Sequence, residues 1–588
     1  MVTAYNEREG SGMYILGING TYHDMAAALL RDGQLVAAAE EERFNRQKHG
    51  KLANPYNAWE LPLQAIDYCL REANITINEV DHIAYSFKPW LRVWNAIPLL
   101  FYQFRHGRFN QLVREAMYFW FTRTFVSSLL TSARQRRMHR LLVFDRRLPF
   151  RIHFVEHHLA HAASAFFVSP FDEAAILSID GTGELVSTLM AEGRGNRIRK
   201  LKELKRQHSL GFFYEEVTTA LGFTKNEDEY KVMALSAFGI PCYQEEFRRL
   251  ITTHPDGTFR VKMDVFRPSL FGPVELQHIS GLPRLWGAPI EQRHKNAAAS
   301  AQRILEEVVL YLCNTLRQWT KMMNLCLAGG VALNCVMNEK LLQRSGFKDI
   351  YVQPAAHDAG TALGAALWVY HVVLNRPRSS GFQMTHAFWG PGYSDQEIEE
   401  CLKRYGIRYK RPPSITQETA RLLSEGKIVA WFQGRMEWGP RALGARSILA
   451  SPCDVRIREQ LNLIKGREEF QPYAASVLED KAHEWFEVDR PSRFMLFAKK
   501  VRSEKKAFIP AVLHADDTSR IQTVDRYSLP IFYELIKEFE RLTNVPLLLN
   551  TSFNRKGEPI VCSPEDALEC FFASPLKYLA IGSFLVEK

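Results

Sequence analysis

Cysteine is scarce in this chain, and no long hydrophobic run occurs in it. The 588 residues include nine cysteines, an odd number with no Cys-x-x-Cys pair. This usage favours buried, reduced thiols over a disulfide framework or a zinc ribbon. No stretch approaches the roughly 18 apolar residues that a membrane-spanning helix needs. The first residues also lack a basic start followed by an apolar stretch, so we expect no secretory signal and a cytoplasmic location.

Low-complexity tracts are absent as well, and the composition is that of a globular enzyme, with 46% hydrophobic and 24% charged residues. The length exceeds what a single hydrophobic core usually supports, so we expect at least two domains. The segments "NRPRSSG" and "KRPPS" are rich in the proline, serine and glycine that are typical of linkers. We therefore predict an N-terminal domain over 12–375, a linker over 376–411 and a C-terminal domain over 412–588.

Positive charge is concentrated in one segment. From Lys88 to Arg147 there are eleven Arg and one Lys against two acidic residues, a net of +10 that equals the net charge of the whole chain. Aromatic residues alternate with these arginines, and we treat 88–150 as an insertion. Three interpretations stay open: amphipathic helices with a wet arginine face, a lid or acceptor-binding insertion, or contact with a membrane surface or RNA. No RNA-reading motif accompanies the segment, so we expect no nucleic-acid partner.

Two strand-rich halves are indicated within the N-terminal domain. The runs "YILGING" and "AAALLRDGQLVAAAEEERF", with the turn signal Asp32-Gly33, predict a hairpin. A helical pattern extends from about 296 to 321. "LCLAGGVALNCVMNEKLL" then predicts a strand, a Gly-Gly turn and a helix, and the next such turn carries Asp358. Because glycine turns allow close backbone approach to phosphate, we expect each half to offer one to a shared nucleotide.

A histidine pair precedes a glycine-rich turn. His157 and His161 stand four apart in "EHHLAHAASAF", and "ILSIDGTGE" follows with Asp180. Residues four apart lie on one helix face, so two imidazoles can hold one metal ion. Each pattern alone has an ordinary explanation, since such pairs also occur in cores and "DGTG" also forms hairpin turns. Together they suggest a metal beside a nucleotide.

The C-terminal third places basic residues among glycines, prolines and aromatics, where arginines favour planar anions over water. For each single arginine a structural salt bridge is the alternative. Asn550 and Ser552 follow the apolar run "VPLLLN" in a turn that could bind phosphate. The basic residues in question are Arg435, Arg441, Arg446, Lys465, Arg467 and Arg520.

These motifs resemble a known family, the carbamoyltransferases that modify hydroxyl groups of natural products and nodulation signals, such as the tobramycin and nodulation-factor enzymes. The resemblance extends from Ile15 to the C-terminus apart from the insertion. It implies an α/β protein with an N-terminal domain of the actin-like ATPase superfamily, built from duplicated subdomains, and a C-terminal YrdC-like α/β domain. The motifs are "GINGTYHD", "EEERFNRQKHG", "HHLAHAASAF", "DGTGE", "GGVALNCVMN", "QPAAHDAGTALGAAL", "GRMEWGPRALGARS" and "NTSFNRKGEPIV".

For the C-terminal domain, the resemblance implies that carbamoyl phosphate and ATP, with Mg²⁺, are converted to carbamoyladenylate. The matching positions depart from the family at Gln471, where "REEFQPYA" replaces a usual arginine. Either a neighbour such as Arg435 or Arg467 compensates, or carbamoyl phosphate binds weakly. The positions implied to hold the phosphate and the adenylate are Arg441, Arg446, Lys465, Gln471, Arg520, Asn550 and Ser552.

For the N-terminal domain, the resemblance implies transfer of the carbamoyl group to a hydroxyl of a small-molecule natural product, as in antibiotic biosynthesis. A homodimer is plausible by the same resemblance. His23 is the candidate general base, and Asp180, close to the metal centre, is the second candidate catalytic residue. Lys48, His49, Gly330 and Asn334 match adenylate contacts. The implied metal ligands are His157, His161, Asp180 and Asp358, and they suit Fe²⁺, with Mn²⁺ or Zn²⁺ as alternatives.

Two alternatives from other classes remain. A tRNA threonylcarbamoyladenosine-type synthase gains some support from the basic segment. A non-catalytic nucleotide-binding protein gains some from Gln471. Phosphate or pyrophosphate release from carbamoyl phosphate and ATP, without an acceptor, discriminates among the three.

Overall fold

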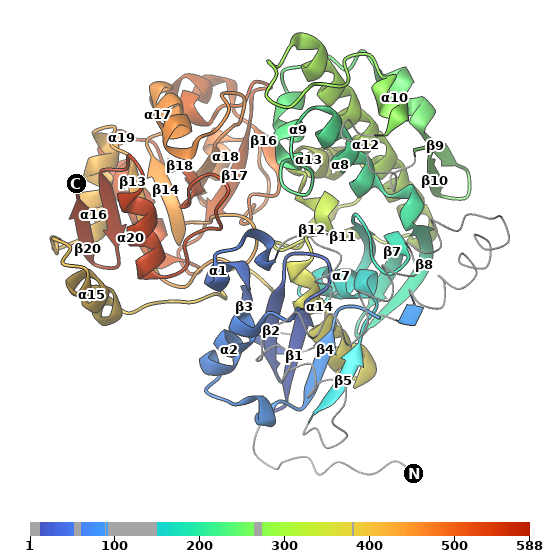
Figure 1. Ribbon diagram of the computed structural model, residues 1–588, viewed down its shortest axis with the longest axis horizontal. Helices are drawn as coiled ribbons and strands as arrows, with labels where there is room; N and C mark the ends of the chain where they lie inside the picture. Colours follow the sequence, from blue (N-terminus) through green and yellow to red (C-terminus); the bar gives the residue numbers. More distant parts are fainter. Residues whose placement is uncertain (1–11, 52–59, 89, 92–149, 264–272, 379–381) are drawn as a thin grey trace.

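The computed structural model describes residues 12–51, 60–88, 90–91, 150–263, 273–378 and 382–588 (Figure 1). Most of the basic insertion, residues 89 and 92–149, lies outside these ranges, and so do the interpretations that concern it. Within the described ranges no helix has both the length and the apolar character that crossing a bilayer requires.

The first sheet has five strands in the order β3-β2-β1-β4-β5. β1 pairs antiparallel with β2, and β2 with β3, whereas β1–β4 and β4–β5 are parallel. The predicted hairpin is confirmed at Asp32 and Gly33, whose φ values of 50° and 80° are those of a tight hairpin turn. The strands are β1 (Tyr14–Asn19), β2 (Ala26–Arg31), β3 (Gln34–Glu40), β4 (His82–Tyr85) and β5 (Arg151–Phe154).

The second sheet repeats the same topology. Read from β8, its order is β8-β7-β6-β11-β12, with two antiparallel pairs followed by two parallel pairs. Each sheet thus starts with a three-stranded meander and adds two parallel strands beside the first. The duplication expected from the sequence is therefore confirmed. The strands are β6 (Glu173–Ile179), β7 (Val186–Arg194), β8 (Arg197–Lys205), β11 (Asn324–Ala328) and β12 (Asp349–Val352).

Two helices lie between the sheets. α7 (His157–Phe166) follows the last strand of the first sheet, and α14 (Ala359–Trp368) follows the last strand of the second. Both helices and inward residues of both sheets form one buried cluster, and Figure 1 shows the pair at the junction. Gly364 allows this contact, because a Cβ there would stand 1.7 Å from the carbonyl oxygen of Ala160. The packing brings the two helix N-termini together.

The outer faces of the two sheets are covered by further helices. Apolar residues of α2 pack on the first sheet, and those of α8 and α12 pack on the second. The predicted long helix and the strand–turn–helix after it are confirmed by α12, β11 and α13. The bounds are α1 (Glu42–Asn45), α2 (Leu63–Glu72), α8 (Leu210–Ala220), α9 (Glu229–Ser236), α10 (Gln244–Leu250), β9 (Ile251–His254), β10 (Thr258–Val261), α11 (Val274–Gln277), α12 (Gln292–Thr320) and α13 (Cys335–Arg344).

The C-terminal third forms a mixed sheet of eight strands, so the α/β class holds here as well. The order is β16-β17-β15-β18-β14-β13-β19-β20. The strands are β13 (Val429–Phe432), β14 (Arg446–Ala450), β15 (Ala474–Leu478), β16 (Ala498–Lys500), β17 (Thr518–Val524), β18 (Leu547–Ser552), β19 (Tyr578–Ile581) and β20 (Phe584–Glu587). The helices are α15 (Asp395–Arg404), α16 (Ile415–Ser424), α17 (Arg456–Lys465), α18 (Ala482–Trp485), α19 (Pro530–Thr543) and α20 (Pro564–Phe572).

The linker predicted over 376–411 is too long. Residues from Ala387 onward are part of the C-terminal core, and α15 buries Ile398 and Leu402 in it. Ser394 caps this helix and forms a capping box with Glu397. The Ser-x-x-Glu pattern is present in the sequence, but the prolines on either side favoured the prediction of a linker.

The C-terminal third contacts both halves of the N-terminal domain. Arg43 donates to the carbonyl oxygen of Gly439 at 2.9 Å. On the other side, Lys231 pairs with Glu468 at 3.1 Å, and Lys499 pairs with Glu339 at 2.9 Å. Figure 1 shows the orange and red part of the chain beside both regions.

Candidate functional site

Four segments meet where the duplicated halves join. The β1–β2 loop (20–25) and the β6–β7 loop (180–185) connect equivalent strands of the two sheets, and α7 and α14 follow equivalent strands. The hydroxyl of Tyr22 in the first loop donates to the carbonyl oxygen of Gly183 in the second at 2.8 Å. The duplication therefore places two loops and two helix N-termini around one point.

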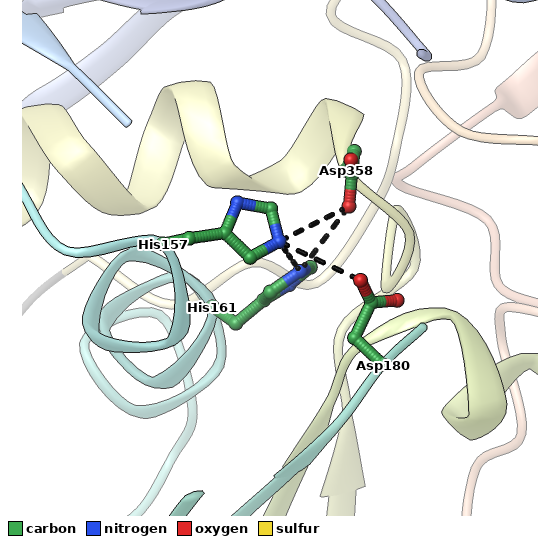
Figure 2. A group of neighbouring side chains, drawn as sticks. All are labelled: His157, His161, Asp180 and Asp358. Carbon is green, nitrogen blue, oxygen red and sulfur yellow. Dashed lines mark hydrogen bonds and ion pairs between the residues drawn. The ribbon is translucent and has the colours of Figure 1, made fainter. Parts of the chain in front are cut away.

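A group of two imidazoles and two carboxylates, all buried except the partly exposed Asp180, lies at this point (Figure 2). His157 and His161 come from the first turns of α7, Asp180 from the end of β6 and Asp358 from the start of α14. The two Nε2 atoms are 3.1 Å apart. Asp358 Oδ1 lies 3.3 Å from Nε2 of His157 and 3.4 Å from Nε2 of His161, and Asp180 Oδ2 lies 3.5 Å from Nε2 of His157.

The arrangement fits a divalent cation. Two ligands each about 2.1 Å from one ion stand roughly 3.0–3.4 Å apart, which matches the separations of these atoms. Burial by itself would raise the pKa values of Asp180 and Asp358, but the neighbouring histidines lower both, so the carboxylates are ionised. Two buried anions this close favour a cation between them. Burial lowers the pKa of His161, so its imidazole is neutral as a metal ligand must be. Burial by itself would lower the pKa of His157 too, but Asp358 and Asp180 outweigh it and raise that pKa, so a bound cation would displace the proton of that ring.

Further contacts hold the ligands in place. The Glu184 carboxylate accepts hydrogen bonds from the backbone N–H of His157 at 3.1 Å and of Lys88 at 2.7 Å. Asp180 Oδ1 accepts from the backbone N–H of Gly330 at 2.8 Å. A Cβ on the preceding Gly329, whose φ is 89°, would lie 2.1 Å from the carbonyl oxygen of Ile179. The two glycine turns seen in the sequence are thus adjacent.

A second group of side chains stands beside this one. The Asp24 carboxylate lies 2.8 Å from Nδ1 of His23 and 2.7 Å from Nδ1 of His49. Burial lowers the pKa of His23, but Asp24 outweighs burial and raises it to about 10. The imidazole therefore carries a proton at neutral pH in this state, in contrast to the base expected from the sequence.

Two of the expected adenylate contacts are engaged within the protein. Lys48 pairs loosely with Glu227 at 3.7 Å. The Asn334 side chain caps α13 by accepting from the N–H of Met337 and also bonds Gln302 at 2.9 Å. Its amide is therefore satisfied without a ligand, and its contribution to nucleotide binding would come from the backbone.

A cluster of cationic side chains lies in the C-terminal third. Arg441, Arg467 and Arg520 pair with no carboxylate among the residues that the structure describes. Burial lowers the pKa of Arg520 to about 9, and the charges of Arg441 and Arg467 contribute to this. The Nε atoms of Arg441 and Arg520 are buried without partners, and Arg467 packs over the ring of Tyr473. Repelling guanidinium groups without a counter-ion indicate an anion site.

This guanidinium cluster touches the N-terminal domain. Arg441 Nη2 lies 3.4 Å from the carbonyl oxygen of Leu333, which ends the short turn η5 (Gly330–Leu333) after Gly329. Gly330 in turn donates to Asp180 of the metal-type group. One turn therefore separates the anion site from the histidine–aspartate group.

Other predicted anion ligands gather nearby. The Lys465 Nζ is buried and donates to the carbonyl oxygens of Ser552 at 2.7 Å and Asn554 at 2.6 Å. Asn550 donates to Ser476 at 2.9 Å, and its Oδ1 is buried without a partner. Gln471 is buried, and its side-chain amide donates to Glu468. Of the two proposed substitutes for the missing arginine, Arg467 stands in the cluster, whereas Arg435 pairs with Glu72 at 2.9 Å.

The expectation for Arg446 is wrong. This side chain is completely buried and lies 3.7 Å from the centre of the Phe432 ring. Its donors bind backbone carbonyl oxygens, including those of Gln433 at 3.0 Å and Pro391 at 3.0 Å. With its hydrogen-bonding capacity used by the backbone, Arg446 holds the fold together and is not available to an anion.

Stability measurements should separate the two kinds of arginine. We expect Arg446→Ala to lower the free energy of unfolding by more than about 3 kcal/mol, because it leaves several buried carbonyl groups unsatisfied and opens a cavity. Arg441→Ala should leave the free energy of unfolding unchanged or raise it, since it removes one of three repelling cations. Thermal unfolding of both variants beside the wild type checks this. Equal losses would contradict the assignment.

Two residues of the site, Asp24 and Glu184, were assigned no role from the sequence. Asp24 stands directly after His23 in "TYHD", so an adjacent carboxylate was visible but received no role. Glu184 closes the "DGTGE" motif, yet its part in capping α7 depends on the fold.

Two family models match this chain. Residues 14–367 match the family model described as carbamoyltransferase N-terminus, and residues 420–588 match that described as carbamoyltransferase C-terminus. The chain belongs to the carbamoyltransferase family. The histidine–aspartate group lies within the first match and the guanidinium cluster within the second.

Three relatives are similar to this chain over most of their length. An uncharacterized protein of Synechocystis sp., sll1178, is 40% identical over 98% of this chain and 97% of its own length. Nodulation protein NolNO of Sinorhizobium fredii is 37% identical over 97% of this chain and 80% of its own. Nodulation protein NolO of Bradyrhizobium diazoefficiens is 40% identical over 74% of this chain and 79% of its own.

Similarity to solved structures is weak. HypF of T. kodakarensis aligns with 62% of this chain and 49% of its own, at 11% identity and a TM-score of 0.32. Sua5 of P. abyssi complexed with L-threonine aligns with 29% of this chain and 47% of its own, at 17% identity and a TM-score of 0.22.

Proposed function

We propose that this carbamoyltransferase is an ATP-dependent O-carbamoyltransferase that works through two half-reactions in one chain. The observation that carries the proposal is the guanidinium cluster without acidic partners, which contacts the turn that leads to the histidine–aspartate group. An anion site and a metal-type site next to each other suit a reaction in which a mixed anhydride of carbamate and AMP is made at one and consumed at the other.

The first half-reaction is assigned to the C-terminal domain. Carbamoyl phosphate and water give carbamate and phosphate, and carbamate then attacks the α-phosphate of Mg²⁺–ATP, releasing pyrophosphate and leaving carbamoyladenylate. Arg441, Arg467 and Arg520 would bind the phosphate groups and stabilise charge that develops during displacement. Lys465, Gln471, Asn550 and Ser552 would line the same site.

The second half-reaction is assigned to the N-terminal domain. The acceptor oxygen attacks the carbamoyl carbon, the bond to the phosphate oxygen breaks, and AMP leaves with the electron pair. A divalent cation would supply positive charge that polarises the carbamoyl carbonyl. Its ligands would be His157, His161, Asp180 and Asp358. The family resemblance favours Fe²⁺ over Mn²⁺ or Zn²⁺.

His23 is proposed to take the acceptor's proton. Asp358 and Asp180 are among the charges that raise its pKa. Asp24 raises that pKa more than either of them, so neutralising Asp180 and Asp358 would remove part of the rise, and the imidazole would act as a base in the fraction that has lost its proton. Lys48, His49 and the backbone at Gly330 and Asn334 are proposed to face the adenylate.

The acceptor is proposed to be a hydroxyl-bearing small molecule. Nodulation proteins among the relatives support a signal molecule or another natural product, and antibiotic precursors belong to the same class. A homodimer and a cytoplasmic location complete the proposal.

Product release without an acceptor tests the first half. With carbamoyl phosphate, Mg²⁺ and ATP, the protein should release phosphate and pyrophosphate, and release should stop when carbamoyl phosphate is omitted. A threonylcarbamoyladenosine-type synthase would instead require bicarbonate and threonine. A nucleotide-binding scaffold would release neither product, and either result would reject the proposal.

A further inference from the structure

One buried carboxylate contacts two imidazoles in the N-terminal site. Asp24 is 6% exposed, and its two oxygens lie 2.8 Å from Nδ1 of His23 and 2.7 Å from Nδ1 of His49. A carboxylate accepts and does not donate, so each Nδ1 carries the proton. In both rings the other nitrogen, Nε2, is then the atom left for a substrate, and Nε2 of His49 is buried without a partner.

The backbone is distorted so that these side chains meet. Tyr22, Asp24 and His49 have φ values of 49°, 52° and 64°, in the left-handed region that side chains with a Cβ rarely adopt. Such strain persists only where surrounding contacts fix it and is concentrated at functional sites.

The contacts that fix this conformation are present. Asn19 Nδ2 donates to the carbonyl oxygens of both His23 and Asp24, at 3.1 and 3.0 Å. The N–H of His49 donates to Glu42 at 2.6 Å, and the N–H of Met25 donates to the carbonyl oxygen of His49 at 3.3 Å. The segment around His49, 25 residues along the chain, is thus bound to the loop of Asp24.

We propose that Asp24 is a positioning residue that orients His23 and His49 together. This inference rests on the proposed function. With Nδ1–H of His23 held by Asp24, Nε2 is directed to the acceptor hydroxyl. In the form of the ring that has no proton on Nε2, this nitrogen takes the hydroxyl proton as the oxygen attacks the carbamoyl carbon and AMP leaves. With Nδ1–H of His49 held by the other oxygen, Nε2 of that ring is directed to the adenylate. Asp24 stays ionised throughout and stabilises the imidazolium that forms.

A carboxylate that orients imidazole rings differs in its expected effects from one that only supports the loop. Replacing a carboxylate that orients a catalytic imidazole by an amide allows the wrong tautomer and costs on the order of 10⁴-fold in the Ser-His-Asp enzymes. Here the amide of Asp24→Asn would affect two rings at once. A supporting residue would change stability without selecting a ring nitrogen.

The test compares Asp24→Asn with Asp32→Asn. Asp32 is the control, because it also has a left-handed backbone, with φ of 50°, in a turn of the same sheet, whereas its exposed carboxylate accepts the backbone N–H of Met13 at 2.9 Å. Carbamoylation of glycerol, used as a simple hydroxyl probe, reports transfer, and pyrophosphate release reports the C-terminal half in the same sample. We expect transfer to fall at least about 10³-fold in Asp24→Asn only, with pyrophosphate release within twofold of wild type in both variants.

A double variant shows whether Asp24 acts through His23. Residues that act as a unit give losses that do not multiply, so Asp24→Asn/His23→Gln should lose no more transfer activity than the worse single variant. Losses that multiply, or an Asp24→Asn variant that keeps transfer within threefold of wild type, would overturn the proposal.

An acceptor-free measurement keeps the inference distinct from the proposed function. ¹⁵N NMR of histidine-labelled protein, assigned with His23→Gln and His49→Gln, should show a protonated Nδ1 in both rings of the wild type and a change in both in Asp24→Asn. If the two signals do not respond, the inference fails. If they respond but glycerol is not carbamoylated, the inference about orientation holds and only the acceptor part of the proposed function fails.

Discussion

Replacing Arg441 by Ala is expected to reduce carbamoyladenylate formation by about 10³-fold or more. Arg441 belongs to the cluster with Arg467 and Arg520, in which no guanidinium group pairs with a carboxylate of the described residues, and its Nε is buried without an acceptor. The positive charge is therefore available to phosphate groups of the substrates. Pyrophosphate release in the presence of carbamoyl phosphate and ATP, measured at saturating substrate, gives the rate.

A matched change elsewhere separates this effect from a general loss of charge. Arg421 is half exposed and pairs with Glu418 and Glu425 on its own helix. Arg421→Ala should release pyrophosphate at the wild-type rate. If Arg441→Ala stays within threefold of wild type, the guanidinium cluster is not the site of adenylate formation.

Removing a member of the histidine–aspartate group should abolish transfer and leave adenylate formation intact. Asp358 Oδ1 stands within 3.4 Å of both imidazole Nε2 atoms, so Asp358→Asn removes the charge that holds the group together. His161→Ala removes a ligand without altering charge at neutral pH. We expect each variant to lose at least about 10³-fold in transfer, because loss of a ligand removes the cation on which carbonyl polarisation depends.

Metal content provides a readout apart from activity. Metal bound per chain, measured by mass spectrometry of the elements after dialysis, should fall toward zero in Asp358→Asn and His161→Ala. The exposed His483 offers a control, and His483→Ala should keep both metal and transfer. Variants that keep wild-type metal content would contradict the assignment of these four ligands.

Local patterns were enough to predict much of the fold. The hairpin at Asp32-Gly33, the long helix α12 and the Gly-Gly turn follow from turn chemistry and periodicity, which depend on neighbours in the sequence. His157 and His161 share a helix face for the same reason. Their meeting with Asp358, some 200 residues later, was suggested by family resemblance and is brought about by the duplicated topology, which places α7 and α14 side by side.

Other features depend on contacts that sequence patterns do not reveal. In the sequence, Arg446 and Arg441 both stand among glycines and apolar residues, so they could not be told apart. Only the folded chain brings the carbonyl groups of Pro391, Gln433 and Cys562 to the Arg446 side chain. The pairing of Asp24 with His49 likewise requires the left-handed backbone at both residues. Part of the predicted linker proved to be core because α15 buries one apolar face against the C-terminal sheet.

Detection of carbamoyladenylate by mass spectrometry tests most directly the claim that two sites in one chain share the reaction. Wild type, Arg441→Ala and His161→Ala are mixed with ATP, carbamoyl phosphate and Mg²⁺, without an acceptor, and quenched at short times. We expect carbamoyladenylate in the wild type and in His161→Ala, and none in Arg441→Ala. Absence of the adenylate from the wild type, or its equal loss in both variants, would contradict the assignment of two half-reactions to two sites.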